Sequence, residues 1–403
     1  MQRGMTWKEL LFVLPLLLLV AVFSLYPIFS SGLYTLFDYQ TNDQTRNRLY
    51  TGGNLNAELF YEDGRYLNHY LKKDMEKVDE AGKAAIASLI TDITTHMAPY
   101  EGIKGTQPLS AQEAAATAAF VDDVQARLNS LADSFQQAEL QTPIKAEAYL
   151  AEMRSCIVGS NFVGLAGYQK LLQDARFFTA LKNTLVFTVI SVAIELVLGM
   201  ALALIMDKSI RGIGIVRTTS LIPWAIPTAV SALIWTYLYD GSSGVVARMI
   251  TQIGLLKSPE LLLTTINGAM AAAVLADVWK TTPYMALLLL AGLQIIDRGL
   301  YESSAIDGAG AVRTFRKITL PMLMPSMLVA LLFRTLDAFR VYDLIAVLTK
   351  GTPETLSIYA YKVMVGQSNY GYGSVIVLAM FLCVAAIAVL YVKVLGAELI
   401  TDA

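Results

Sequence analysis

The chain has 403 residues, of which 55% are hydrophobic and only 16% are charged. Its mean hydropathy of +0.51 is too high for an ordinary soluble protein, and its length allows several membrane spans. The formal net charge of −2 gives no reason to expect binding to nucleic acid. Two cysteines and two histidines are too few for a disulfide framework or a His/Cys metal site, so we expect no bound metal.

Apolar runs along the chain predict about six transmembrane helices. About 20 apolar residues cross the hydrocarbon layer, and a charge near its centre costs about 3 kcal/mol. The six candidate spans are 10–37, 183–206, 218–239, 268–296, 318–349 and 363–392. Glu195 interrupts the second run, Asp277 and Lys280 lie in the fourth, and the fifth becomes charged toward its end.

The short loops predict the orientation. With the N-terminus in the cytoplasm, most Lys and Arg of the short loops lie inside, which is what the positive-inside rule expects. The first apolar run follows Arg3 and Lys8, but it is too long for a signal peptide and has no convincing cleavage site. We therefore expect it to remain as an anchor.

The stretch 38–165 between the first two spans is then extracytoplasmic. It carries 18 Asp and Glu against 11 Lys and Arg and is soluble in character. Two amphipathic stripes predict at least two helices that pack as a hairpin: Leu71, Met75, Val78, Ala85 and Leu89, and Val121, Val124, Leu128, Leu131 and Phe135. We expect the apolar stripes of these helices to pack against each other. A face that binds a partner would be additional to this packing.

Residues 301–321, YESSAIDGAGAVRTFRKITLP, form a charged stretch between two apolar runs. Gly308 and Gly310 break the helical pattern, which predicts two short helices on the inner membrane surface. Apolar residues recur every three positions in the second half, and Pro321 suits the first turn of the next span. These features alone fit an interfacial helix on anionic lipid as well as a docking element.

The same stretch resembles the cytoplasmic EAA signature of binding-protein-dependent ABC importer permeases. That signature is Glu-Ala-Ala, three residues, Gly, nine residues and Ile-x-Leu-Pro. This chain matches it with Glu302, Gly308, Ile318, Leu320 and Pro321, while Ser303 and Ser304 replace the two alanines. Stretches such as ALKNTLVFTVISVAIELVLGMALAL and DVWKTTPYMALLLLAGLQ are similar to the carbohydrate-uptake branch, which includes the maltose and glycerol-phosphate permeases. The resemblance covers nearly everything except 40–160.

The resemblance implies that the two short helices fit into a cleft of a cytoplasmic ATPase subunit. Glu302 would cap or fix the entry, Gly308 would permit the turn, and Val312, Phe315 and Ile318 would form the contact. We therefore expect no cofactor on this chain, with ATP and Mg bound by the partner ATPase. The chain indeed has no G-x-x-x-x-G-K-[ST] motif.

The resemblance also implies an assembly in a bacterial inner membrane. Its partners would be a second permease subunit, an ATPase dimer and an extracytoplasmic solute-binding protein, and it favours a heteromeric permease pair. In the maltose importer a comparable permease carries an outer insertion that contacts the binding protein. By that analogy of position, 38–165 would hold or recognise the binding protein.

Charges within the predicted spans are candidates for the substrate path. They are Glu195, Asp277, Arg334, Asp337, Arg340 and Asp343. Such groups face the bundle interior or a wet cavity, so they either pair to lock helices together or line the path of the sugar. Four aromatic residues could stack on a sugar or could mark the membrane interface: Trp224, Trp235, Trp279 and Tyr284.

Two other classes of membrane protein remain as alternatives. A sensor or receptor would use the outer insert but needs a cytoplasmic output domain. A secondary transporter would show repeated span pairs with broken helices, which the sequence does not display, and leaves 301–321 without a role. No nucleophile–base constellation indicates an enzyme.

We therefore predict an all-α integral membrane protein that forms half of the translocation path of a sugar ABC importer. Its domains are 1–37 with the first span, 38–165 as the helical insert, and 166–403 as the permease core with five spans and the coupling loop 297–321.

Overall fold

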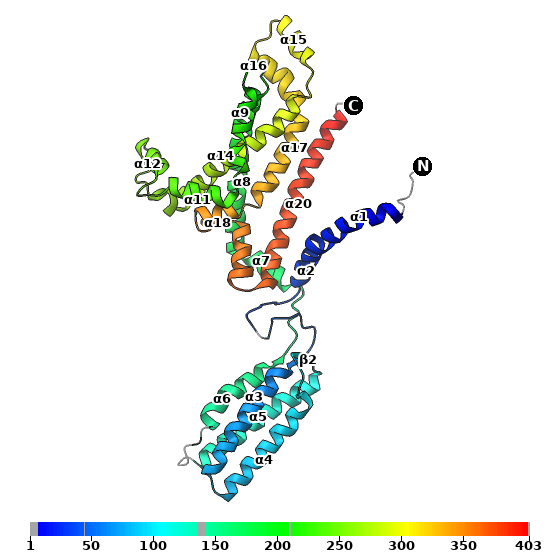
Figure 1. Ribbon diagram of the computed structural model, residues 1–403, viewed down its shortest axis with the longest axis vertical. Helices are drawn as coiled ribbons and strands as arrows, with labels where there is room; N and C mark the ends of the chain where they lie inside the picture. The colour runs from blue at the N-terminus through cyan, green and yellow to red at the C-terminus, as the bar shows by residue number, and fades with distance from the viewer. Residues whose placement is uncertain (1–6, 44, 136–139, 141, 209–210, 402–403) are drawn as a thin grey trace. The chain divides into compact units, whose positions relative to one another are not determined.

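The computed structural model describes residues 7–401 except 44, 136–139, 141 and 209–210, and most of the described chain is helical (Figure 1). Two compact units make up the chain. One comprises Met1–Gln169 with Val363–Val375, and the other comprises Lys170–Lys362 with Ile376–Ala403. The predicted domain boundaries at 37 and 165 are not tested by this division and remain a prediction.

Long apolar helices form the membrane part. Within the described residues, five helical segments are long and apolar enough to cross a membrane: Val13–Tyr34, Ala175–Met206, Ile266–Leu293, Ala311–Phe339 and Tyr370–Lys393. They are built from α1 (Trp7–Val20), η1 (Ala21–Leu25), α2 (Tyr26–Tyr34), α8 (Ala175–Met206), α14 (Ile266–Leu293), α16 (Ala311–Thr314), η5 (Phe315–Thr319), α17 (Leu320–Phe339) and α20 (Tyr370–Thr401). The predicted all-α membrane fold is confirmed.

The predicted third span is not one straight helix. The pair Ile213–Ala225 and Thr228–Leu238 is bent by 89°. Ile226, which precedes Pro227, is extended (φ −70°, ψ 133°), because a following proline ring disfavours the helical conformation. The segment therefore consists of α9 (Ile213–Ser220), α10 (Ile222–Ala225) and α11 (Thr228–Leu238).

The predicted fifth span is too long at its C-terminal end. α17 ends at Phe339, and a separate helix, α18 (Asp343–Leu348), begins after the non-helical residue Tyr342. Asp343 therefore does not continue the helix that carries Arg334. At the other end, helical structure runs without a break from Ala311 through the π-helical turn η5 into α17. Pro321 lies inside this segment, just after Leu320 donates an i→i−5 bond to the Phe315 carbonyl.

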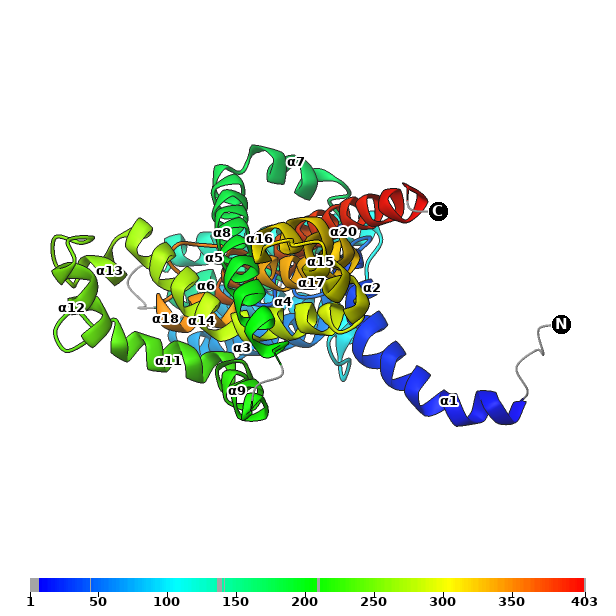
Figure 2. The ribbon, with the colours of Figure 1, turned by 90° about the horizontal axis from the view of Figure 1, so that it is seen from above.

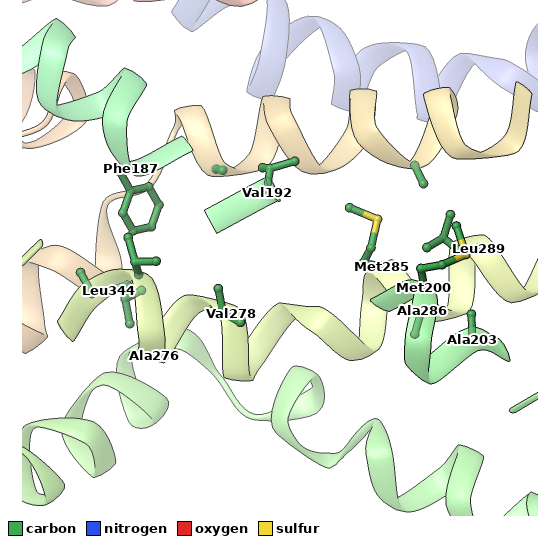
Figure 3. Close-up of a cluster of buried hydrophobic side chains, with 14 of the residues drawn as sticks. Phe187, Val192, Met200, Ala203, Ala276, Val278, Met285, Ala286, Leu289 and Leu344 are labelled. Carbon is green, nitrogen blue, oxygen red and sulfur yellow. The ribbon is translucent and has the colours of Figure 1, made fainter. Parts of the chain in front are cut away.

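Three helices form the centre of the second unit. α8 packs along α14, and both contact α17 (Figures 1 and 2). A side chain at Gly199 would come within 2.7 Å of Met285 Cγ, and one at Gly292 within 2.5 Å of Ser326 Cβ. Small residues at these crossings therefore let the helix backbones approach closely. Figure 3 shows part of the apolar cluster between them, including Phe187, Met285 and Leu289.

Shorter elements complete this unit. α12 and α13 lie at the far end of α11 in Figure 2. The bounds are α7 (Ala166–Gln173), α12 (Val245–Gln252), α13 (Leu261–Thr264), α15 (Arg298–Ile306), α19 (Leu356–Tyr361) and η6 (Lys362–Gly366), with α7 and η6 crossing the division between the units.

Among its described residues the insert has four main helices and a small sheet, which meets the expectation of at least two helices but extends beyond a hairpin. Its elements are β1 (Asn54–Asn56), α3 (Ala57–Asp74), η2 (Met75–Lys77), α4 (Glu80–Met97), η3 (Ala98–Tyr100), β2 (Thr106–Pro108), α5 (Ala111–Ser134), α6 (Thr142–Ser155) and β3 (Ile157–Val158). The sheet order is β2-β1-β3, and both pairs are antiparallel.

Most residues of the two predicted stripes lie in the insert's core. Leu71 and Leu89 of the first stripe and Val121, Val124 and Leu128 of the second are buried. Ala85 is exposed, however, and Ile86 is buried in its place. The phase shifts because Asp79 caps a new helix through the Gly82 N–H, so a single stripe cannot run from α3 into α4.

One carboxylate in the insert is buried without full pairing. Asp63 is 3% exposed, and its Oδ2 has no hydrogen-bond partner among the described residues. Burial, together with the negative charges of Glu152 and Glu62, raises the pKa of Asp63 to about 7. Burial and the charge of Asp63 also raise the pKa of the Cys156 thiol to about 12.

Candidate functional site

A charged cavity of about 470 Å³ lies in the second unit, where α10, α11, α14, α17 and α18 meet. It is lined by Trp224, Thr228, Asp277, Lys280, Thr281, Arg334, Asp337, Ala338, Arg340, Val341, Tyr342, Asp343 and Leu344. Five of the six predicted path residues are therefore brought to one cavity. The sixth, Glu195, is fully buried on α8 and does not line it.

Arg334 is the centre of a buried ion network. Its side chain is 1% exposed, and it donates to Glu195 through Nε at 2.5 Å and Nη2 at 2.9 Å. Nη2 also bonds Asp277 of α14, and Nη1 bonds Asp337 at 3.1 Å. The Thr281 hydroxyl lies 2.7 Å from Glu195 Oε1, the oxygen that also accepts from Nη2 of Arg334.

This network joins three helices, because its carboxylates come from α8, α14 and α17. A guanidinium that is removed from water needs such partners to offset its desolvation. The structural pairing that the sequence left open is therefore present for Glu195, Asp277 and Arg334. Their role in the substrate path remains a prediction.

The outer residues of the cavity keep exposed charge. The Asp337 side chain is 67% exposed, and Arg340 donates to the Leu336 carbonyl at 3.1 Å while its charge stays exposed. Asp343 reaches the same cavity from the first turn of α18. These three residues have the access to a solute that the Arg334–Glu195 pair lacks.

The bend of the third span forms one wall of the cavity. Lys280 of α14 donates to the Trp224 carbonyl at 3.2 Å, and the Trp224 ring stacks on Tyr284 with centroids 5.5 Å apart. Because the helix stops after Ala225, the Trp224 carbonyl has lost its usual helical partner, and Lys280 supplies the bond. Lys280 and Tyr284 therefore hold the end of α10 at two points.

Trp235 and Trp279, the other candidate aromatic residues, contact each other edge to face at 5.6 Å and do not line the cavity. Thr228 and Tyr342 do line it, and the sequence analysis missed both. Thr228 follows Pro227 and could have been suspected as cavity-facing from the break. Nothing in the sequence signals Tyr342.

The predicted coupling loop forms two short helices joined by a glycine turn. α15 is capped at its start by Asp297, whose Oδ1 accepts from the Gly299 N–H at 2.9 Å. Glu302 is exposed in the middle of α15 and is not its N-cap, so the capping role is wrong, while the alternative that Glu302 fixes the entry of the loop remains a prediction. At the other end Gly308 has φ +70°, the left-handed conformation that ends a helix and favours glycine.

The predicted contact face of this loop splits into two parts. Val312 is 73% exposed, whereas Phe315 and Ile318 are half-buried, and Phe315 packs on the core of the unit. Ser304 is buried, and its hydroxyl lies 3.2 Å from that of Thr314, which joins the two short helices. Leu320 and Pro321 lie within the helix that follows, and Ser303 is exposed.

The exposed part of the loop offers apolar and cationic groups together. Ile306 is 87% exposed, close to Val312 in sequence. An open recess of about 800 Å³ is lined by Gly310, Ala311, Val312, Arg313, Arg316 and Lys317. Such a surface suits a protein partner with apolar and acidic side chains.

No metal-binding constellation was found in the part of the chain that the structure describes: no three His, Cys, Asp or Glu side chains are grouped to hold an ion. In the ion network the guanidinium of Arg334 occupies the space between the carboxylates. The expectation that ATP and Mg bind to a partner remains a prediction.

Comparison with known proteins identifies the family. The model of the family described as "Binding-protein-dependent transport system inner membrane component" matches residues 195–397. The chain belongs to this family. The match includes the cavity, the ion network and the 297–321 loop.

Curated relatives of this inner membrane component support the same assignment. The trehalose transport system permease protein SugA of Mycobacterium tuberculosis is 43% identical over 260 residues, which is 63% of this chain and 83% of the relative. The trehalose/maltose transport system permease protein MalF of Thermococcus litoralis is 43% identical over 237 residues, covering 58% and 79%. These relatives are transport permeases, so the chain is a transport subunit and not an enzyme.

The fold agrees with a solved transporter. A chain of a bacterial ABC transporter involved in import of the acidic polysaccharide alginate aligns with a TM-score of 0.51 and 22% identity. The alignment covers 58% of this chain and 84% of that chain. The second unit (Lys170–Lys362 with Ile376–Ala403), called the membrane unit below, therefore shares the fold of that transporter chain. The family match, together with the long apolar helices, confirms the predicted multi-pass membrane protein.

Proposed function

We propose that this permease subunit forms half of the translocation path for a sugar or sugar derivative, and that the 470 Å³ cavity is part of that path. The observation that carries the proposal is the meeting of five predicted path residues with Trp224 and Tyr342 at one cavity. Sugar hydroxyls both donate and accept hydrogen bonds, so a wall with carboxylates, cations and aromatic faces suits them.

Charge balance favours a neutral solute. Carboxylates and cations are both present in the lining, and the Arg334 network neutralises the deepest of them. Two relatives are named for transport of trehalose, or of trehalose and maltose. We infer that an α-linked disaccharide is the first substrate to test, with trehalose as the probe.

We further propose that residues 297–321 dock on an ABC ATPase subunit that binds ATP and Mg. The exposed pair Ile306 and Val312, beside Arg313, Arg316 and Lys317, would form the contact. Phe315 would transmit the movement, because it connects the loop to the core, and the half-buried Ile318 would support it. The N-terminus and this loop would then lie in the cytoplasm, and 38–165 outside.

The remaining partners follow from this role. One permease forms half of a path, so a second permease subunit is required, and we propose a heterodimer. A solute-binding protein would deliver the sugar on the outer side. The alternatives of a sensor and a secondary transporter receive no support from the family or from the relatives.

Uptake of labelled trehalose tests the role of the cavity. The chain is co-expressed with its neighbouring transporter genes and reconstituted, and wild type is compared with Lys280→Met. We expect at least a 10-fold loss of uptake, because the Trp224 carbonyl and the wall of the cavity lose their support.

Lys257→Met is the matched control, since Lys257 is exposed and lies outside the cavity. Its uptake should equal that of wild type. Equal uptake by all three proteins would exclude the cavity from the path, and uptake of no sugar by any assembled complex would overturn the sugar assignment.

A further inference from the structure

A second polar cavity, of about 480 Å³, lies at one end of the membrane unit. Its residues follow the last residue of α8, Met206, and the last residue of α14, Leu293, and they include the start of α15. Because both long helices end there, the cavity lies at the boundary between hydrocarbon and water. It shares no lining residue with the 470 Å³ cavity.

The second cavity is rich in cations. Lys208, Arg217 and Arg298 line it, against one carboxylate, Asp207. The part of the chain that the structure describes gives neither Lys208 nor Arg298 a salt bridge. Three positive charges around one small space attract an anion, and the effect is strongest where hydrocarbon lies close by.

Arg217 is held in position for such a ligand. Its Nε and Nη2 donate to the Met206 carbonyl at 3.2 Å and 2.6 Å, which fixes the guanidinium at the end of α8. The remaining N–H groups of the fork are left for another acceptor. A planar guanidinium with two such donors matches the oxygens of a phosphate group.

Apolar surface surrounds these charges. Leu293 and Ile296 are buried in the wall of the cavity, while Ile205, Ile215 and Val216 are exposed on α8 and α9 next to it. A phosphate group attached to a hydrocarbon chain could bind the cations through its oxygens and contact the apolar side chains through its chain. Basic pockets between transmembrane helices are typical sites for such headgroups.

We propose that this cavity binds a phosphate group, carried either by an anionic phospholipid or by a soluble phosphate. Lys208, Arg217 and Arg298 bind the phosphate oxygens, and Tyr301 adds a hydroxyl to the wall. The exposed apolar side chains of α8 and α9 favour the lipid as the source.

The bound phosphate would act on the 297–321 loop. Arg298 is the first residue of α15, and the Tyr301 hydroxyl accepts a hydrogen bond from the Thr319 hydroxyl at 3.3 Å. A ligand held between Arg217 and Arg298 therefore ties the start of this loop to the end of α8. Phosphate binding would restrict the loop's movement relative to the spans.

Titration of the purified full chain in a neutral detergent tests the site. Short-chain phosphatidylglycerol and inorganic phosphate are added separately, and the shift in melting temperature gives the affinity of each. The test variant is Lys208→Gln/Arg298→Gln, which keeps the Arg217 bond to Met206. We expect phosphatidylglycerol to bind this variant about 30-fold more weakly, since each cation near a lipid surface contributes about 1 kcal/mol.

Lys182→Gln/Lys257→Gln is the matched control, because it removes the same charge from exposed residues elsewhere. It should bind like wild type, and Lys208→Arg/Arg298→Lys should restore binding. The ligand that wild type binds more tightly identifies the source of the phosphate. Equal affinities of wild type, test variant and control for both ligands would overturn the proposal.

Discussion

The insert and the membrane unit are both helical and both have buried apolar side chains, yet they differ in the side chains that they expose. In the insert, Leu55, Phe60 and Leu67 are completely buried, and charged residues cover the helices. In the membrane unit Val189 and Val197 are more than 60% exposed, while Glu195 and Arg334 are buried. The two regions are therefore built for different solvents.

This difference indicates which interactions stabilise the fold of each region. Apolar side chains gain free energy by leaving water, so the insert is stabilised by its core. Hydrocarbon gives no such gain, and the membrane helices depend on close packing at Gly199 and Gly292 and on polar contacts such as the Arg334 network. Apolar truncations should therefore destabilise the insert most, and loss of a buried charge should destabilise the membrane unit most.

The largest effect is expected for Arg334→Met. Loss of the cation leaves the Glu195 and Asp277 carboxylates buried without their partner, which typically costs about 3–5 kcal/mol. Thermal unfolding of the full chain in detergent measures the loss. Arg340→Met removes an exposed cation and should change stability by less than about 1 kcal/mol. Similar losses for both variants would refute the structural role of the network.

Truncation of an apolar side chain should reduce stability more in the insert than on the exposed face of a membrane helix. Leu67→Ala in the insert removes a completely buried side chain and should destabilise it by about 3 kcal/mol. Val197→Ala in α8 removes an exposed side chain of the same class and should change stability by less than about 0.5 kcal/mol. Amide hydrogen exchange of α3 and α8 in the full chain reports both. A larger effect at Val197 would contradict the comparison.

Asp63 makes the stability of the insert depend on pH. Because its pKa is raised to about 7 from 3.8, the folded insert binds the proton more tightly than the unfolded chain does. Stability is therefore greatest below about pH 4 and falls as pH rises to about 7, with an upper limit of about 4 kcal/mol.

Asp63→Asn keeps the shape of the side chain and removes the charge, so it should stabilise the insert by about 2 kcal/mol at pH 8 and remove this pH dependence. Hydrogen exchange of α3 at pH 5 and pH 8, corrected for the intrinsic exchange rate, measures the stability of the insert at each pH. Asp92→Asn, at an exposed residue, serves as the control. An unchanged pH dependence in Asp63→Asn would show that another group is responsible.

Among the four test variants, setting the controls aside, the smallest effect on stability is expected at the glycine turn of the 297–321 loop. Gly308 and Gly310 both have open space for a Cβ, but only Gly308 has a positive φ. Gly308→Ala should cost about 1 kcal/mol, and Gly310→Ala should cost less. Co-purification of the ATPase subunit should fall several-fold for Gly308→Ala alone. Equal co-purification would mean that the turn's conformation does not govern docking.

Most membrane helices were located correctly because their positions follow from local composition, whereas the third span is bent and the fifth ends earlier than predicted. The insert's stripes were also found locally, and the error at Ala85 arose because the cap at Asp79 resets the helical phase. Pro227 accounts for the end of the helix at Ala225, whereas the size of the 89° bend cannot be read from local composition. Local sequence composition therefore locates the helices but does not give the angles between them.

The candidate site was predicted in part. Isolated charges stand out in apolar runs, and five of the six predicted path residues line one cavity, while their role in the path stays a prediction. The partnership of Glu195 with Arg334 spans 139 positions, and a single sequence contains no information on such distances. Lys280 was noticed as a charge, but its bond to the freed Trp224 carbonyl follows only from the bend.

The small sheet of the insert has a consequence for engineering. Leu55 of β1 lies directly opposite Ile157 of β3, so the chain enters and leaves the helical part of the insert at neighbouring points. The residues between Leu55 and Ile157 therefore form a segment whose two ends are joined by the β1–β3 pair and which could be replaced as a unit. A fluorescent domain whose termini are equally close could be exchanged for it, which would turn the transporter into a reporter of its own location without lengthening the path between the flanking segments.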